Sequence, residues 1–167
     1  LISEYHIDGF RFDLTKGFTN EEIAENYISS RVDYLKMIAD DIRDVDEESY
    51  IIFEHFQGFE EKIFSDYGIL TWGEENYNYN EATMGYTSDF SGISYKKRGF
   101  KNPTLVGFME SHDKERLMYK NLEYGNSSGS YDIKYFDNAI DRMKAAGALF
   151  FTIPVSYTHL TLPTIRT

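Results

Sequence analysis

The stretch YHIDGFRFD, residues Tyr5–Asp13, decides the fold, because it reads as a single strand that ends in ionisable side chains. Apolar and polar residues alternate along it, as they do in a half-buried strand. The segments between this strand and the next apolar runs have helical character, so the sequence predicts a parallel sheet with helices on its faces. The other predicted strands are Tyr50–Phe56, Gly68–Trp72, Pro103–Met109 and Ala148–Ile153.

The connecting segments carry the signals of helices. Thr19 and Glu22 form a capping-box pattern, and apolar residues at helical spacing follow it. This pattern predicts a helix from Asn20 to about Val45. Further helices are expected at Glu60–Tyr67, from near Asn80, and from Ile133 to about Ala146 behind a cap at Asp132.

The composition excludes several classes of function. The chain has 17 basic and 28 acidic residues, a net charge of −11, which disfavours nucleic acid and anionic membrane surfaces as partners. The absence of cysteine excludes disulfides, thiolate zinc sites and cysteine nucleophiles. No apolar run approaches the roughly 20 residues of a membrane span. The sequence therefore describes an acidic globular chain without a predicted membrane span.

Two architectures fit parallel strands separated by helices: an open doubly wound sheet and a (β/α)8 barrel. No glycine-rich phosphate loop follows a strand, which weakens the case for a nucleotide-binding open sheet. In a barrel, catalytic groups lie at the carboxyl ends of several strands, and three predicted strands here end near Asp13, Glu54 and Asp113. Five strands cannot close an eight-stranded barrel. The prediction is therefore an α/β chain that forms the C-terminal part, about strands 4–8, of a truncated TIM barrel.

The three carboxylates suggest a chemistry. Asp13, Glu54 and Asp113 are separated by 41 and 59 positions, and each gap has room for a crossover helix. Three carboxylates in one cleft cannot all behave alike, so one is expected to donate a proton while another stays ionised. Glycoside hydrolysis uses that division. Arg11 lies two residues before Asp13 and shares its strand face, where its cation would keep Asp13 ionised. His112 offers a donor to a sugar hydroxyl.

Three motifs resemble conserved regions two, three and four of the alpha-amylase family of glycoside hydrolases. They are GFRFDLTK (Gly9–Lys16), IIFEHF (Ile51–Phe56) and MESHDKER (Met109–Arg116), and they occur in the family's order. The resemblance covers residues 1–154, which are expected to be a partial catalytic barrel carrying strands four, five and seven. It implies cleavage of alpha-1,4-glucosidic bonds in starch-like alpha-glucans, with retention of configuration and a covalent glycosyl-enzyme intermediate.

The resemblance also implies individual roles. Asp13 falls on the nucleophile and Glu54 on the general acid/base. Asp113 falls on the carboxylate that grips sugar hydroxyls and stabilises the oxocarbenium-like transition state. Retention predicts that the nucleophile and acid carboxyls lie about 5–5.5 Å apart. The substrate-binding positions of the family are matched by Arg11, Lys16 and His112.

The sequence departs from the family pattern in places. The first conserved region, with its Asp and Asn-His on strand three, is absent from the 167 residues. Many members carry Lys-His where this chain has Lys16-Gly17. The resemblance leaves calcium binding by the intact parent possible. A backbone carbonyl in this stretch often helps to bind calcium in the family, and Gly17 keeps that carbonyl, but the other calcium ligands lie outside the 167 residues. The resemblance implies no other cofactor and assigns no metal ligand.

The two ends of the sequence suggest a fragment. Residues Val155–Thr167, VSYTHLTLPTIRT, carry one charge and a threonine at every third position, and they resemble a translated sequencing adapter. They are expected to be an artefactual tail. A truncated barrel exposes unpaired strand edges, so the 167 residues alone are expected to be poorly soluble and inactive on starch. Since a polymeric glucan cannot enter a cell intact, an extracellular or periplasmic parent is expected.

Other functions remain open on the sequence alone. Debranching enzymes, cyclomaltodextrin hydrolases and glucan transferases share the three carboxylates. A non-catalytic glucan-binding relative would tend to lose one of them. A metal-dependent barrel hydrolase would need His6, His55, His112 and Asp113 as ligands, but His6 lies early in its strand, at the wrong end. His6 and His55 are therefore interpreted as histidines satisfied by local hydrogen bonds.

Overall fold

The computed structural model describes residues 1–152. They divide into two compact units. The first consists of Leu1–Gly73 and Ser94–Val106, and the second of Glu74–Ile93 and the described residues from Gly107 onward. Among residues 1–152 no helix combines the length and the apolar character needed to cross a membrane.

Most residues of a four-stranded parallel sheet belong to the first unit. Its strands are β1 (Gly9–Phe12), β2 (Tyr50–Phe53), β3 (Leu70–Glu74) and β4 (Leu105–Phe108), in the order β1-β2-β3-β4. β1 pairs in parallel with β2, and β2 in parallel with β3. The predicted α/β class and four of the five predicted strands are confirmed. β1, β2 and β4 are shorter than their predicted ranges, whereas β3 has the predicted length and begins two residues later.

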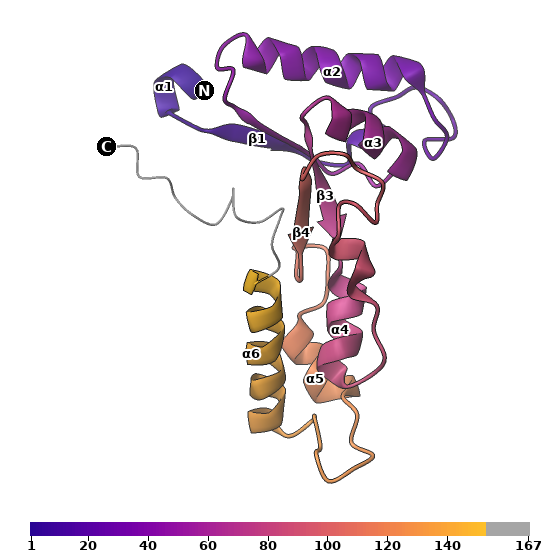
Figure 1. Ribbon diagram of the computed structural model, residues 1–167, viewed down its shortest axis with the longest axis vertical. Coiled ribbons are helices and arrows are strands. Elements are labelled where there is room, and N and C mark those ends of the chain that lie inside the picture. The colour runs from indigo at the N-terminus through magenta and orange to yellow at the C-terminus, as the bar shows by residue number, and fades with distance from the viewer. Residues whose placement is uncertain (153–167) are drawn as a thin grey trace. The chain divides into compact units, whose positions relative to one another are not determined.

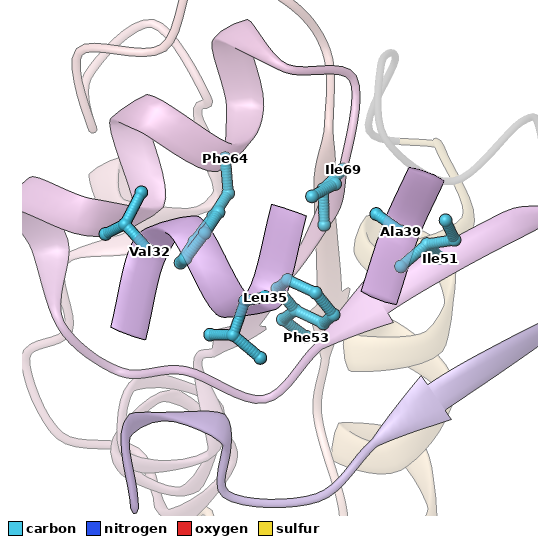
Figure 2. Packing of buried hydrophobic residues seen from close by; sticks show 7 residues of the cluster. All are labelled: Val32, Leu35, Ala39, Ile51, Phe53, Phe64 and Ile69. Carbon is cyan, nitrogen blue, oxygen red and sulfur yellow. The ribbon is translucent and has the colours of Figure 1, made fainter. Parts of the chain in front are cut away.

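Helices α2 (Ser29–Arg43) and α3 (Gly58–Asp66) connect these strands and supply the core of the first unit. Figure 2 shows this core, to which α2, α3, β2 and the residue preceding β3 contribute. The rings of Phe53 and Phe64 meet edge to face, with centroids 5.2 Å apart. The buried members of the cluster are Val32, Leu35, Ala39, Ile51, Phe53, Phe64 and Ile69.

The predicted helix from Asn20 to Val45 begins nine residues later than expected, at Ser29. The Thr19 hydroxyl accepts a hydrogen bond from the amide of Glu21 at 3.1 Å, which makes a local turn instead of a capping box. The loop after it is held by a side chain, because the carbonyls of Ala24 and Asn26 accept hydrogen bonds from Arg31. Hydrogen bonds from the Arg31 side chain thus take the place of the backbone hydrogen bonds of the predicted helix.

Three helices make up most of the second unit. They are α4 (Asn76–Met84), α5 (Leu117–Tyr124) and α6 (Phe136–Thr152), which contact one another (Figure 1). Arg142 of α6 donates to the carbonyls of Ala82 and Thr83 near the end of α4, where a helix leaves carbonyls unpaired. The short elements of the chain are α1 (Ile2–Tyr5) and the 3-10 turns η1 (Thr15–Gly17) and η2 (Phe90–Ile93).

The predicted last strand, Ala148–Ile153, is wrong for its described residues, because α6 continues through Thr152. The Thr152 hydroxyl donates to the carbonyl of Ala148, and Phe150 packs with Ala146 in the core of the second unit. A short apolar run satisfies a buried helix face as well as a buried strand. α4 begins at Asn76 instead of Asn80, and α6 at Phe136 instead of Ile133; the tail Val155–Thr167 lies outside the described residues.

Replacing Gly9 by Ala is expected to lower the free energy of unfolding of the first unit by about 3 kcal/mol. A Cβ atom at this position would lie 2.1 Å from the Tyr50 carbonyl oxygen, so β1 and β2 would have to separate. Urea unfolding followed by the fluorescence of Trp72, the only tryptophan of the chain, measures the effect. Gly58→Ala is the control, because a Cβ there meets nothing within 4 Å. Equal losses in both variants would contradict the prediction.

Candidate functional site

Two acidic side chains and one arginine meet where β1 and β2 end. Arg11 lies in β1, Asp13 directly follows β1, and Glu54 directly follows β2. Nη1 of Arg11 is 2.5 Å from Oδ1 of Asp13, and its Nη2 is 2.9 Å from Oε2 of Glu54. The side chain of Asp13 is 70% exposed and that of Glu54 only 7%. One guanidinium thus bridges an accessible carboxylate and a buried one.

The parallel register explains why these residues meet. Phe12 is paired with Phe53, so the next residues, Asp13 and Glu54, leave the sheet at the same edge. The expected pairing of Arg11 with Asp13, two positions apart on one strand, is observed. Arg11 is also oriented from β3, because its guanidinium carbon lies 4.8 Å from the centre of the Trp72 ring.

The residues after β1 and β2 share an unusual backbone feature. Leu14 and Phe56 have left-handed conformations, with φ of 42° and 54°, which side-chain-bearing residues rarely adopt. Each donates its amide to a carboxylate at 3.0 Å, Leu14 to Glu54 and Phe56 to Glu61. Burial raises the pKa of Glu61, against the lowering effects of Arg98 and of the Phe56 amide. Such strained residues persist where the surrounding structure holds them, and they concentrate at functional sites.

Behind this edge lies a buried polar network. Thr15 donates its amide to the Glu54 carbonyl at 2.8 Å, and its hydroxyl lies 2.9 Å from Nδ1 of His55. Nε2 of His55 is 2.8 Å from Oε2 of Glu60, and Glu60 receives two hydrogen bonds from Arg31. Thr15, Arg31, His55 and Glu60 are all at most 1% exposed.

Burial lowers the pKa of His55 from 6.5 to about 4, although the hydrogen bond to Glu60 acts to raise it. Burial by itself would raise the pKa of Glu60, but hydrogen bonds from Arg31, the Ile28 amide and His55 outweigh burial and lower it. At neutral pH the imidazole is therefore neutral beside a carboxylate. Nε2–H then donates to Glu60, and Nδ1 accepts from the Thr15 hydroxyl. The predicted satisfied histidine at position 55 is confirmed.

Lowering the pH from 6.5 to 4 is expected to cost the first unit about 3 kcal/mol of stability through His55. Its pKa is lower in the folded chain than in the unfolded one, so its contribution is complete above pH 6.5 and is lost as the pH falls toward 4. The lowered pKa of Glu60 acts in the same direction below its ordinary value of 4.5. Urea unfolding by Trp72 fluorescence at several pH values measures the loss. His55→Gln should flatten this part of the profile; an unchanged slope would contradict the assignment.

The other predicted site residues, Lys16, His112 and Asp113, each have an ion-pair contact of their own. The Lys16 ammonium is 3.5 Å from Oε1 of Glu25, in the loop before α2. His112 and Asp113 belong to the second unit, where Nε2 of His112 is 3.2 Å from Oδ1 of Asp113 and both side chains are exposed. Glu110 accepts the Leu117 amide at 2.7 Å and thereby fixes the turn between these residues and α5. The sequence pattern does not predict the buried polar network that contains Thr15, Arg31 and Glu60.

The backbone carbonyls of Lys16 and Gly17 are engaged in hydrogen bonds within the chain. The Gly17 carbonyl accepts a hydrogen bond from the Thr19 amide at 2.8 Å, and the neighbouring Lys16 carbonyl accepts one from Arg31. Within residues 1–152, histidine and acidic side chains form no group of three or more that could hold a metal ion.

No protein-family model and no curated protein sequence matches this chain.

Proposed function

We propose that this chain is part of a retaining glycoside hydrolase that cleaves alpha-1,4-glucosidic bonds in starch-like alpha-glucans. The observation that carries the proposal is the guanidinium of Arg11, which bridges exposed Asp13 and buried Glu54 at the ends of two adjacent parallel strands. A pair of close carboxyl groups in different surroundings is what the two-step retaining mechanism requires.

The strand order supports a barrel as the architecture. Each strand neighbours the next one in the sequence, whereas a doubly wound sheet reverses its order at the crevice where ligands bind. We assign β1 to β4 to about strands four to seven of a (β/α)8 barrel. Catalytic groups then belong at the carboxyl ends of the strands, where Asp13 and Glu54 lie.

In the first step, the Asp13 carboxylate attacks the anomeric carbon of the bound glucan. The bond from that carbon to the glycosidic oxygen breaks, and the Glu54 carboxyl donates its proton to the departing oxygen. The product is an ester between Asp13 and the sugar. Arg11 and the Leu14 amide, which lie 2.9 and 3.0 Å from Glu54, stabilise the carboxylate that this transfer leaves behind.

In the second step, Glu54 acts as a base. It takes a proton from a water molecule, whose oxygen attacks the anomeric carbon, and the bond to Asp13 breaks. Two inversions give net retention, and both carboxyl groups return to their starting states. By the family resemblance, Asp113 grips sugar hydroxyls and stabilises the transition state, and His112 is a substrate-binding residue.

Product analysis of the complete protein tests the proposal. Maltoheptaose is digested, and the configuration of the new reducing ends is followed by proton NMR before mutarotation. We expect the alpha-anomer first, together with shorter maltooligosaccharides. Formation of the beta-anomer first, or no turnover, would overturn the proposal. New linkages among the products would reassign the same site to glucan transfer, and binding without turnover would indicate a non-catalytic relative.

A further inference from the structure

We propose that Thr15 and His55 are positioning residues for Glu54, held in place by the buried pair of Arg31 and Glu60. This inference rests on the proposed function, because it concerns the placement of the general acid. None of the four residues is exposed enough to touch a substrate. Whatever they contribute to the reaction must therefore pass through the residues that they contact, among which Glu54 is a proposed catalytic group.

The first link joins the loop after β1 to the end of β2. The Thr15 amide donates to the Glu54 carbonyl at 2.8 Å, and the adjacent Leu14 amide donates to the Glu54 carboxylate at 3.0 Å. Two consecutive residues thus hold both the backbone and the side chain of Glu54. A shift of this loop relative to β2 would change the place at which the carboxyl meets the glycosidic oxygen.

The second link fixes Thr15. Its hydroxyl lies 2.9 Å from Nδ1 of His55 and 3.2 Å from the Glu54 carbonyl. Because Nε2 of His55 donates to the Glu60 carboxylate, Nδ1 is left as an acceptor and accepts the hydrogen bond of the Thr15 hydroxyl. The ring of His55 also packs edge to face on Phe64 of the core, with centroids 4.9 Å apart. His55 therefore has little freedom to turn.

The third link anchors the network to the rest of the first unit. All five N–H groups of Arg31 have acceptors, two of them on Glu60 and three on backbone carbonyls of the preceding loop. A guanidinium with five satisfied donors in a rigid fork orients its partner carboxylate closely. These carbonyls belong to Lys16, Ala24 and Asn26.

The geometry separates the two proposed catalytic carboxylates. The Arg11 guanidinium contacts both carboxylates, but Glu54 also accepts hydrogen bonds from the amides of Thr15 and Leu14 across the strands. Loosening Thr15 should therefore disturb proton transfer more than nucleophilic attack. That difference is measurable, because a leaving group of low pKa departs without a proton and makes the first step independent of the acid.

Thr15→Val removes the hydroxyl, and Thr15→Ser keeps it as the matched control. In the complete protein we expect Thr15→Val to lower kcat on maltoheptaose by about 100-fold, as a misplacement of roughly 1 Å can. KM should change by less than about threefold. Turnover of 2,4-dinitrophenyl alpha-glucoside in the presence of azide should fall by less than about threefold, since azide attacks the glycosyl-enzyme without a base. Thr15→Ser should stay within about threefold on both substrates.

Equal losses on both substrates in Thr15→Val would show a merely structural role and would overturn the inference, as would an unchanged rate on maltoheptaose. Inactivity of the unmodified protein on both substrates would instead overturn the proposed function, so the two failures are distinguishable. If Thr15→Val lacks the native fluorescence of Trp72, His55→Leu removes the hydrogen-bond partner of the Thr15 hydroxyl instead. The rates of that variant on the same two substrates then test the inference.

Discussion

Asn in place of Asp13 is expected to lower kcat of the complete protein on maltoheptaose by about 10⁴-fold or more. An amide cannot form the glycosyl ester, so the first step of the proposed mechanism has no nucleophile. Asp13 contributes little to the core, because its side chain is 70% exposed, so the variant should fold normally. Initial rates of reducing-end formation and the thermal unfolding midpoint measure the two effects separately.

The controls for this prediction come from the same chain. Glu54→Gln should lower kcat by about 10²–10⁴-fold, since it removes the acid and base but leaves the nucleophile. Asp33→Asn, an equivalent change at an exposed position of α2, should leave the rate within about twofold. A wild-type rate in Asp13→Asn would refute the assignment of the nucleophile.

Removal of one partner from the buried ion pair is expected to have the largest effect on stability. Glu60→Leu should lower the free energy of unfolding of the first unit by about 3–5 kcal/mol, because it leaves the guanidinium of Arg31 buried without a counter-ion. Both side chains are fully buried, and Nη2 of Arg31 lies 2.6 Å from Oε1 of Glu60. Urea unfolding followed by Trp72 fluorescence gives the value.

Two further variants distinguish the loss of stability caused by an unpaired buried charge from the loss that any substitution causes. The double variant Arg31→Met with Glu60→Leu removes both charges and should recover most of the loss. Asp66→Asn breaks an exposed pair with Lys101 and should cost no more than about 1 kcal/mol. A Glu60→Leu variant as stable as Asp66→Asn would contradict the prediction.

Much of the candidate site follows from local sequence rules. Arg11 and Asp13 are two residues apart on a strand, so their contact follows from the alternation of side chains. Glu54 is a charged residue in the apolar run Tyr50–Phe56, and a charge in such a run is rare unless it is paired or functional. The parallel register that places Asp13 and Glu54 at one edge depends on pairing between distant segments, and only the structure supplies it.

The buried network was missed because its signal is weak in a single sequence. Arg31 precedes Leu35 by four positions and Glu60 precedes Phe64 by four, so both charges lie on the buried stripes of their helices. A charged residue on such a stripe indicates that it has a buried partner, but the pattern does not show which residue that partner is. The partner lies 29 residues away. Arg31 also binds the carbonyls of Ala24 and Asn26, and these local hydrogen bonds keep the preceding loop out of the predicted helix.

The discontinuity of the first unit has a consequence during synthesis of the chain on the ribosome. Residues 74–93 leave that unit before residues 94–106 return to it with the start of β4. At roughly 5–20 residues per second, the 33 residues from 74 to 106 take about 2–7 seconds to synthesise. Throughout that interval β3 has an open edge where the Thr104 carbonyl will later receive the Thr71 amide. A nascent chain therefore exposes the Thr71 edge of β3 to mispairing until residue 104 has been synthesised.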